Sequence, residues 1–452
     1  MFGIGLGVGV GRSRFAGSFA DAYNSRVLAN GGTIESLSCV SSASTLLQQA
    51  SLLFIPSGYK AGVAYSALPN SGNGDLTWSR NSTAYRTQSD GTIGSVAANV
   101  PRLSYMYGSC PAALLEPQRT NSIRNSIMQG AATGTPGTLP TNYGASTGGL
   151  TRSIVEIGTE NGLSYIDIRM QGTATSVNAQ IVVDTNTSNN ASSSQTYMFS
   201  LYAKLVSGTA NSYQMIWDEW SSTPTYLTSK SITVSLTSTL SRYTLTNSTA
   251  VSCATIQPFL RFILTVGNSY DFTIRIAQPQ LELGAFATTP IFTSGTFATR
   301  LADTFTRNNI YTNGFISANG GTWYVELRNN VSLIPDRNAF GFWLGSSTTS
   351  PTALSTISFR QGGGSNRSGI WFDTTFVAYP TTDTAKIAIK WNGLTLDVFI
   401  NGSKVSGSPF TFTPTISSMQ NLIGDAGRTI FIQAMALFNA PLSDTDCVTL
   451  TT

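Results

Sequence analysis

One short segment combines residue types that often form sugar-binding sites. Residues 216 to 222 read Ile-Trp-Asp-Glu-Trp-Ser-Ser, so two tryptophans flank two carboxylates beside a turn. Ligand sites typically pair aromatic surfaces with a few well-placed polar groups. We therefore predict that Trp217, Asp218 and Trp220 contact a ligand. The alternative is that they form the packed end of an ordinary strand.

A second candidate site lies after a glycine-rich loop at residues 361 to 369, where Trp371 and Asp373 come next in the chain. Glycine lets the backbone approach a ligand closely, so we predict that Trp371 and Asp373 also contact a ligand. Trp323 and Trp391 lie instead on the apolar phase of alternating segments, which predicts that both belong to a core.

The chain contains no histidine. This excludes Ser-His-Asp and Cys-His catalysis, and it excludes metal sites that use histidine. Hydrolysis by two carboxylates remains, with Asp218 and either Glu219 or Asp184 as the pair. Neighbouring residues of a strand point to opposite faces, so Asp218 and Glu219 could not flank one bond there. We predict no catalytic residues and no enzyme activity, with a carboxylate glycosidase as the alternative.

The composition limits the partners. Charged residues make up 11% of the chain, against roughly 25% in typical soluble domains. Serine, threonine, asparagine and glycine replace them, as suits sheets with uncharged outer faces and many turns. The net charge of +4 without a basic cluster predicts no nucleic-acid binding. The absence of an apolar run of 18 residues predicts no membrane insertion, and the start does not resemble a secretory signal.

The four cysteines (Cys39, Cys110, Cys253 and Cys447) are far apart and lack Cys-x-x-Cys spacing. We expect reduced thiols in a protein made in a cytosol, and no zinc site. No cofactor is predicted. Structural calcium could bind where Asp and Asn oxygens converge in loops, but no Asp-x-Asp-x-Asp-Gly loop is present, so no metal ligands are assigned.

The elements that must position these residues are mainly strands. In residues 122–293, Tyr197, Phe199 and Leu201 alternate with polar residues, and so do Phe272 and Ile274. This period of two predicts half-buried strands and a β-sandwich.

Residues 294–452 predict a second sandwich. Alternating apolar residues lead into Asn392-Gly393 and out again, which is a strong hairpin signal because type I′ turns need positive φ at both central residues. Ser443, with Asp446 three residues later, predicts a capped terminal helix.

The N-terminal part differs in kind. Glycine occupies every second position from 3 to 11, and we predict that residues 1–20 are an extended segment that anchors to a neighbouring protein. The alternative is a frayed terminus. Residues 21–121 predict a small α+β attachment region. Phe19, Tyr23 and Val27 indicate a helix that Gly31-Gly32 ends, and a second helix could start at Thr33.

Several segments resemble a signature of tailed-bacteriophage virion proteins. They are Leu-Leu-Glu-Pro-Gln-Arg-Thr-Asn at 114–121, Asp-Leu-Thr-Trp-Ser-Arg-Asn-Ser-Thr-Ala at 75–84 and Pro-Arg-Leu at 101–103. Residues 277–284 resemble the last strand of jelly-roll carbohydrate-binding modules in phage fibres. Residues 391–393 with 398–402 resemble a concanavalin or laminin-G sandwich.

The resemblance implies a mostly β fold, with an irregular α+β N-terminal region followed by two antiparallel sandwiches, jelly-roll and concanavalin-like. It implies a virion structural protein, assembled in the host bacterial cytoplasm and released by lysis. The first expectation is a tail or neck fibre, or adhesin, that displays the sandwiches to host-surface glycans. A capsid-bound head fibre or decoration protein is the alternative, and a carboxylate glycan depolymerase is a third. Partners would be other virion proteins at the N-terminal region, host glycans and further copies of the chain, with a trimer favoured.

Overall fold

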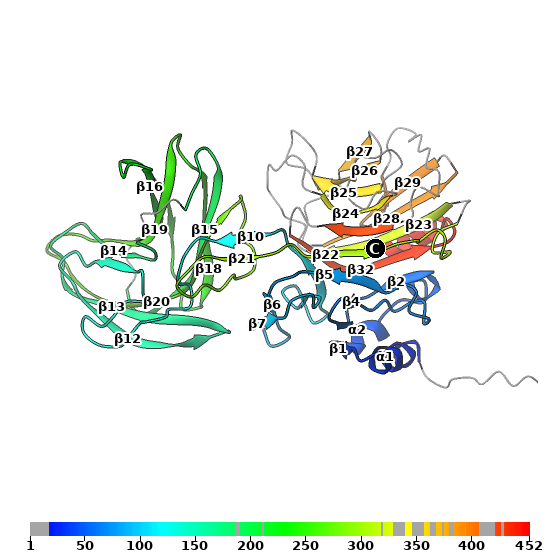
Figure 1. Ribbon diagram of the computed structural model, residues 1–452, viewed down its shortest axis with the longest axis horizontal. Coiled ribbons are helices and arrows are strands. Elements are labelled where there is room, and N and C mark those ends of the chain that lie inside the picture. The colour runs from blue at the N-terminus through cyan, green and yellow to red at the C-terminus, as the bar shows by residue number, and fades with distance from the viewer. Residues whose placement is uncertain are drawn as a thin grey trace, which may run out of the picture.

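The computed structural model consists of two lobes of β-sheet that lie side by side (Figure 1). The structure describes residues 18–185, 190–209, 212–317, 320–328, 340–345, 357–361, 368–372, 375–378, 384–393, 395–405, 421–425 and 429–452. Strands dominate these residues and all named pairings among them are antiparallel, so the predicted mostly β fold with sandwich domains is confirmed. Most of the predicted anchoring segment 1–20 lies outside the described residues.

The smaller lobe is a sandwich of two five-stranded sheets. The first has the order β11 (Gly144–Ser146), β14 (Asn178–Val182), β19 (Cys253–Ile263), β16 (Tyr213–Ser221) and β17 (Tyr226–Val234). The second has the order β12 (Thr151–Glu160), β13 (Leu163–Thr173), β20 (Ser269–Leu283), β15 (Thr196–Gly208) and β18 (Ser241–Ser248). One apolar core fills the space between them.

The larger lobe also contains two sheets. The ten-stranded sheet has the order β1 (Thr33–Ile34), β3 (Gly58–Lys60), β4 (Val63–Ala64), β5 (Leu76–Ser79), β22 (Thr304–Arg307), β31 (Asn421–Asp425), β24 (Phe340–Gly345), β25 (Ile357–Gln361), β26 (Ser368–Phe372) and β27 (Thr375–Ala378). The other has the order β30 (Ser403–Lys404), β29 (Thr395–Ile400), β28 (Thr384–Asn392), β23 (Gly320–Arg328), β32 (Ile430–Phe438), β9 (Ala112–Leu115) and β8 (Leu103–Ser104), and β2 (Leu52–Phe54) also pairs with β32.

Both sheets of the larger lobe combine strands from the two ends of the chain. Leu52 of β2 lies opposite Leu437 of β32, and Thr306 of β22 lies opposite Thr77 of β5. The segments 21–121 and 294–452 therefore share two sheets, although the sequence patterns predict them as separate units. The smaller lobe, residues 122–293, lies between them in the sequence, and we call it the jelly roll.

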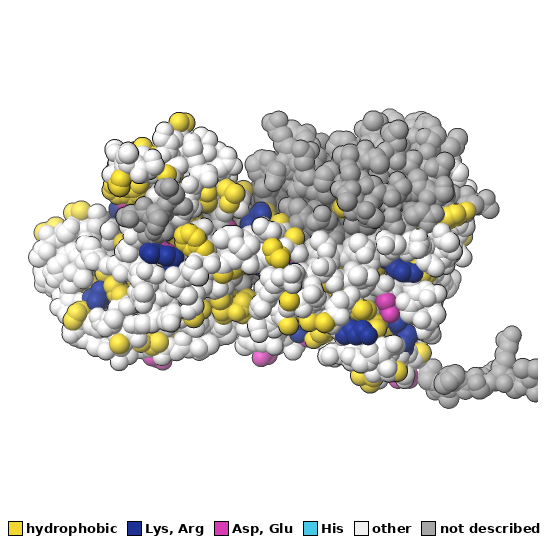
Figure 2. All heavy atoms as spheres, in the orientation of Figure 1, with side chains coloured by type: hydrophobic (Ala, Val, Ile, Leu, Met, Phe, Trp, Pro, Cys, Tyr) yellow, Lys and Arg dark blue, Asp and Glu magenta, His cyan; other side chains and the backbone are white. Residues whose placement is uncertain are grey.

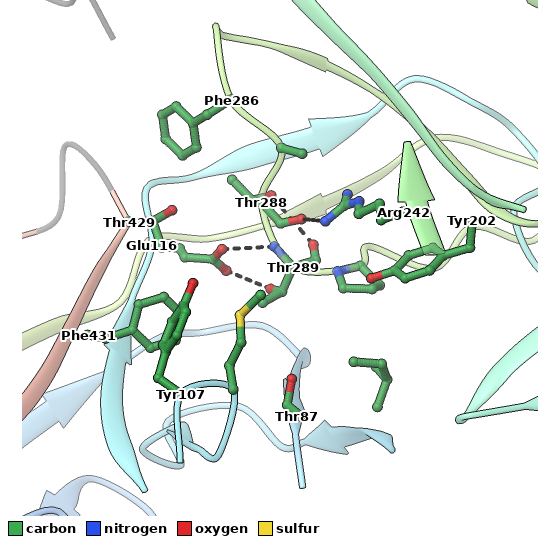
Figure 3. A pocket seen from close by; sticks show the side chains of 14 residues that line it. Thr87, Tyr107, Glu116, Tyr202, Arg242, Phe286, Thr288, Thr289, Thr429 and Phe431 are labelled. Carbon is green, nitrogen blue, oxygen red and sulfur yellow. Dashed lines mark hydrogen bonds between the residues drawn. The ribbon is translucent and has the colours of Figure 1, made fainter. Parts of the chain in front are cut away.

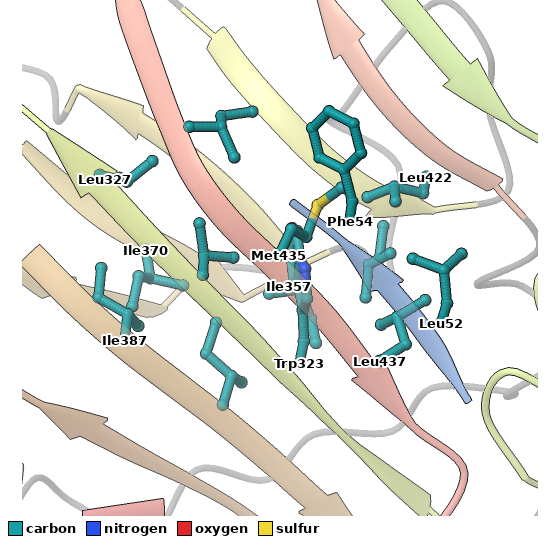
Figure 4. Packing of buried hydrophobic residues seen from close by; sticks show 14 of the residues in the cluster. Leu52, Phe54, Trp323, Leu327, Ile357, Ile370, Ile387, Leu422, Met435 and Leu437 are labelled. Carbon is teal, nitrogen blue, oxygen red and sulfur yellow. The ribbon is translucent and has the colours of Figure 1, made fainter. Parts of the chain in front are cut away.

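A single core joins these two segments. Phe54 from the N-terminal segment packs in one cluster with Trp323 and Met435 from the C-terminal one (Figure 4). Trp391 belongs to the same cluster, and none of the four has exposed surface. The prediction that Trp323 and Trp391 are core residues is confirmed. Burial of an apolar side chain of this size contributes about 2 kcal/mol or more, so neither segment keeps this core without the other.

Two predicted helices have the expected ends. Helix α1 (Phe19–Ala29) begins after Ser18, which forms a capping box with Asp21, and it buries Tyr23 and Val27. Helix α3 (Asp444–Thr451) begins after Ser443, whose Oγ accepts a hydrogen bond from the backbone N–H of Asp446 at 3.0 Å. A side-chain acceptor at this position stabilises a helix because the first N–H groups have no partner within it.

The predicted second helix is wrong at its start. Residues Thr33–Ile34 form β1 opposite β3, and only α2 (Leu37–Ser41) and a 3₁₀ turn (Leu47–Gln49) are helical farther on. Pairing with a strand of the sheet overrides the helical pattern here.

The predicted Asn-Gly hairpin is confirmed, since Asn392 of β28 lies opposite Thr395 of β29 and Gly393 has a φ of +57°.

The expectation of four reduced cysteines is wrong for one pair. Cys39 and Cys110 form a disulfide, with Cα atoms 5.7 Å apart and a sequence separation of 71 residues. Cys253 and Cys447 are free and buried. Spacing alone gives no indication of a bond between residues this far apart, because the fold brings them together.

The lobes meet along several contacts. Strand β10 (Arg119–Asn121), which enters the jelly roll, pairs with β21 (Ala298–Arg300), which leaves it. The hairpin of β6 (Ala84–Thr87) and β7 (Ile93–Val96) reaches from the larger lobe to the jelly roll, where Ile93 N–H donates to the carbonyl of Asn161 at 2.9 Å. Tyr85 also stacks on Phe292, with ring centroids 4.0 Å apart.

The surface reflects the low charge of the chain. Most of the described surface that is visible in Figure 2 is backbone or uncharged polar side chain, with scattered apolar and charged side chains. Among the described residues, no helix is long and apolar enough to cross a membrane.

Candidate functional site

The first predicted site lies on β16, and its residues divide between the two faces of the sheet. Trp217 and Glu219 point into the sandwich and have no exposed surface. Trp217 Nε1–H donates to Glu219 Oε1 at 2.9 Å, and Ala250 N–H donates to Glu219 Oε2 at 2.6 Å. Trp217 is therefore part of the core and offers no surface to a ligand.

Asp218 and Trp220 point to the other face, away from the core, and both are half-buried. Asp218 lies between Ser229 of β17 and Gln257 of β19, and Ser229 Oγ–H donates to Asp218 Oδ1 at 2.5 Å. Trp220 meets Tyr226 of β17 edge to face, with ring centroids 5.6 Å apart. The Trp220 ring is thus held beside an exposed tyrosine instead of turning freely.

The same face continues along β16 and β19. Gln214 lies opposite Arg261, and the Arg261 guanidinium lies over the ring of Phe259 at 5.1 Å. We call the set Gln214, Asp218, Trp220, Gln257 and Arg261 the β16 face. It offers an aromatic ring, two amides, a carboxylate and a guanidinium on a rigid sheet, so it can donate to and accept from hydroxyl groups beside an apolar surface.

The second predicted site is only partly described. Trp371 lies on β26, opposite Ser358 of β25 and Phe376 of β27, and the orientation of its side chain is outside the described residues. Asp373 also lies outside the described residues.

The carboxylates that could form a glycosidase pair do not lie together. Asp218 and Glu219 point to opposite faces of β16, as their adjacency predicts. Asp184 is 1% exposed and pairs with Arg124, whose Nη2 lies 2.6 Å from Asp184 Oδ1. These three carboxylates therefore do not flank a common bond. Within the described ranges, no group of three His, Cys, Asp or Glu residues could hold a metal ion.

The segments 75–84, 101–103 and 114–121 meet in a buried group of charges between the lobes. We call Arg80, Arg102, Glu116, Arg300 and Asp303 the junction cluster. Asp303 pairs with Arg80 at 2.9 Å and with Arg102, while Glu116 pairs with Arg102 at 2.7 Å and with Arg300 at 2.9 Å. All five side chains are at most 2% exposed.

Further hydrogen bonds complete the junction cluster. The backbone N–H and the Oγ–H of Thr289 donate to Glu116 at 2.8 and 2.6 Å (Figure 3). Arg300 also donates to the carbonyl of Pro117 at 2.6 Å. Burial raises the pKa of Glu116, but Arg300 and Arg102 outweigh that effect and set the pKa at about 2. A carboxylate with these partners stays ionised, so the cluster binds the lobes together as charged groups.

Asn121 ends the signature and satisfies four hydrogen-bonding positions at once. Its Nδ2 donates to the carbonyls of Pro279 and Ile291 at 3.2 and 2.9 Å, and its Oδ1 accepts from the N–H groups of Ile123 and Leu281 at 3.0 and 3.1 Å. The sequence patterns predicted no such role. The one available signal was that Asn121 belongs to the segment 114–121 that resembles the virion-protein signature.

No model of a protein family matches the chain, and no curated protein matches it. Among solved structures, CBM40 of the Ruminococcus gnavus IT-sialidase, bound to α2,6-sialyllactose, is similar at 13% identity and a TM-score of 0.24, over 30% of this chain and 85% of that one. The tripod from the baseplate of bacteriophage Tuc2009 is similar at 14% identity and a TM-score of 0.27, over 75% and 98% of the two chains.

Trypanosoma rangeli sialidase is similar at 10% identity and a TM-score of 0.25, over 83% of this chain and 77% of that one. Carbohydrate-binding modules, a phage baseplate protein and a sialidase thus all occur among the structures that resemble the chain. Each likeness is weak, so the function has to be argued from the residues of this chain.

Proposed function

We propose that the chain is a structural component of a bacteriophage virion, a tail or neck fibre or adhesin that displays its jelly roll to glycans of the host surface. The β16 face carries the glycan part of the proposal. The signature at 75–84, 101–103 and 114–121 supports the virion part, because it resembles that of virion proteins.

The β16 face suits a neutral or weakly charged sugar. Trp220 supplies a ring on which the C–H groups of a sugar can stack, and Asp218, Gln214 and Gln257 supply acceptors and donors for its hydroxyls. These side chains stand on neighbouring strands in fixed register, so little conformational entropy is lost when a ligand binds. Strand-borne sites hold their geometry better than loop-borne ones.

Single sites of this kind bind weakly. Several copies on one particle would raise the avidity through effective concentration, which fits a homo-oligomer, with a trimer favoured. In this proposal the N-terminal region contacts other virion proteins and the jelly roll projects from the larger lobe. The larger lobe, with Trp371 and Asp373, offers a second candidate glycan contact.

The test is a glycan array probed with the full chain and two variants. Trp220→Ala should lower the signal on every bound glycan about two- to tenfold, because contact with one aromatic ring contributes on the order of 0.5 to 1.5 kcal/mol. Ile157→Ala removes an exposed side chain from β12 of the opposite sheet and should leave binding unchanged. Loss of binding in both variants, or in neither, would contradict the β16 face as the site.

A further inference from the structure

A cavity of about 190 Å³ lies between the two lobes, beside the junction cluster. Tyr107 and Phe431 line it from the larger lobe, Tyr202 and Arg242 from the jelly roll, and Phe286 from the segment that connects them (Figure 3). Since one water molecule takes about 30 Å³, the cavity has room for roughly six, or for one small organic molecule.

Arg242 is a half-buried cation in the wall of this cavity. It lies on β18 opposite Tyr202 of β15, and its guanidinium lies over the Tyr202 ring at 5.5 Å. Nη1–H donates to the carbonyl of Thr288 and Nη2–H donates to Ser200 Oγ at 2.9 Å. A guanidinium has five N–H donors, so these two bonds leave three.

The charge of Arg242 is not balanced by a direct ion pair within the described residues. Over that part of the chain, no carboxylate pairs with it, and its buried Nε–H has no acceptor. Removing a cation from bulk water without pairing it costs free energy, and a bound anion would recover this. A carboxylate matches the planar fork of an arginine, because two parallel N–H···O bonds can form.

Two charged side chains line the cavity, Arg242 and Glu116. Glu116 is already paired with Arg102 and Arg300, so its charge is balanced within the junction cluster. Glu116 and Asp303 are each shared by two arginines of the junction cluster, and Thr288 donates to Glu282. None of the three carboxylates is paired with Arg242.

The remaining walls suit a sugar ring. Tyr107, Phe286 and Phe431 give apolar surface, and Thr429 Oγ1 is buried without a hydrogen-bond partner among the described residues. We propose that the cavity binds one acidic sugar unit, with its carboxylate on Arg242 and its hydroxyls toward Thr429. This site is separate from the β16 face, so it goes beyond the proposed function. Binding in the cavity does not depend on Trp220.

The test is ligand-observed NMR with the full chain, using D-glucuronate, D-glucose and inorganic sulfate as probes. Glucuronate should bind, and glucose should bind at least tenfold more weakly. Arg242→Gln should weaken glucuronate binding about tenfold or more, while Trp220→Ala should not change it. Arg169→Gln is the matched control, because Arg169 is an exposed arginine on the same sheet and pairs with Asp271.

Thr429→Val gives a second variant that does not depend on the hydrogen bonds of Arg242, and it should weaken glucuronate binding several-fold. Thermal unfolding shows whether each variant keeps its fold. Absence of glucuronate binding, equal binding by Arg242→Gln once it is folded, or unchanged binding by Thr429→Val would overturn the proposal. Sulfate that binds as tightly as glucuronate would also overturn it, because the cavity would then select charge alone.

Discussion

At the scale of single residues, charge is used sparingly and mostly in pairs. The junction cluster places five charged side chains at most 2% exposed in a chain with 11% charged residues. Removing one partner from such a group leaves another buried charge uncompensated, which typically costs about 3 to 5 kcal/mol. Arg80, Arg102 and Glu116, which belong to segments 75–84, 101–103 and 114–121, therefore stabilise the contact between the lobes.

Glu116 predicts an acid-dependent loss of stability. Its pKa is about 2 in the folded chain against 4.5 for the ordinary side chain. Because the folded pKa is lowered, Glu116 stabilises the fold above about pH 4.5, and this contribution, on the order of 3 kcal/mol, is lost as the pH falls toward 2. Urea unfolding of the wild-type chain and Glu116→Gln at several pH values measures it. The variant should have a lower free energy of unfolding than the wild-type chain at pH 7, and that free energy should fall less as the pH is lowered. An equal fall of the free energy of unfolding with pH in both chains would refute this role.

At the scale of elements, local patterns predicted strands and caps well. The Asn392-Gly393 turn and the Ser443 cap have the predicted structure. Residues Tyr197 to Leu201 form a strand as predicted, but both faces of it are buried there instead of one. Which face of a strand points into the core is harder to predict, because it depends on which side of the sheet the opposing sheet covers. Residues 216 to 222 show this: adjacency correctly separated Asp218 from Glu219, but only the sandwich determines that Trp217 points inward.

The Cys39–Cys110 disulfide also depends on elements that meet only in the fold. It ties the short helix α2 to the turn before β9 and closes a loop of 71 residues. Chain entropy predicts that such a bond stabilises the fold by up to about 4 kcal/mol. Replacing both cysteines by serine should lower the free energy of unfolding by that order. A reducing agent should destabilise the wild-type chain equally and leave the variant unaffected; wild-type stability that resists complete reduction would contradict this.

At the scale of the whole molecule, the jelly roll lies between two halves of one larger lobe. No local pattern could predict this, because β2 and β32 pair across more than 380 residues, with Leu52 opposite Leu437. Strand patterns place the jelly roll at 122–293, but they also predict residues 294–452 as a separate sandwich. In the structure, strands from residues 33–115 occupy positions in both of that lobe's sheets.

This arrangement predicts how fragments behave. Residues 119–297 contain a complete core and should unfold cooperatively when expressed alone. Residues 294–452 alone should not fold, since they lack β2, β5, β8 and β9 and the buried side chains these strands supply. Circular dichroism and thermal unfolding of both fragments, with the full chain as the control, measure this. Cooperative unfolding of fragment 294–452 would refute the shared core.

The position of the protein on the virion tests most directly the proposal that it is a tail or neck fibre or adhesin. Immunogold labelling of intact virions, with an antibody against the full chain, should place gold at the tail or neck, and mass spectrometry of purified particles should detect the protein. Gold spread over the capsid would contradict the adhesin and favour a head fibre or decoration protein. Particles without gold and without the protein would contradict a virion role altogether.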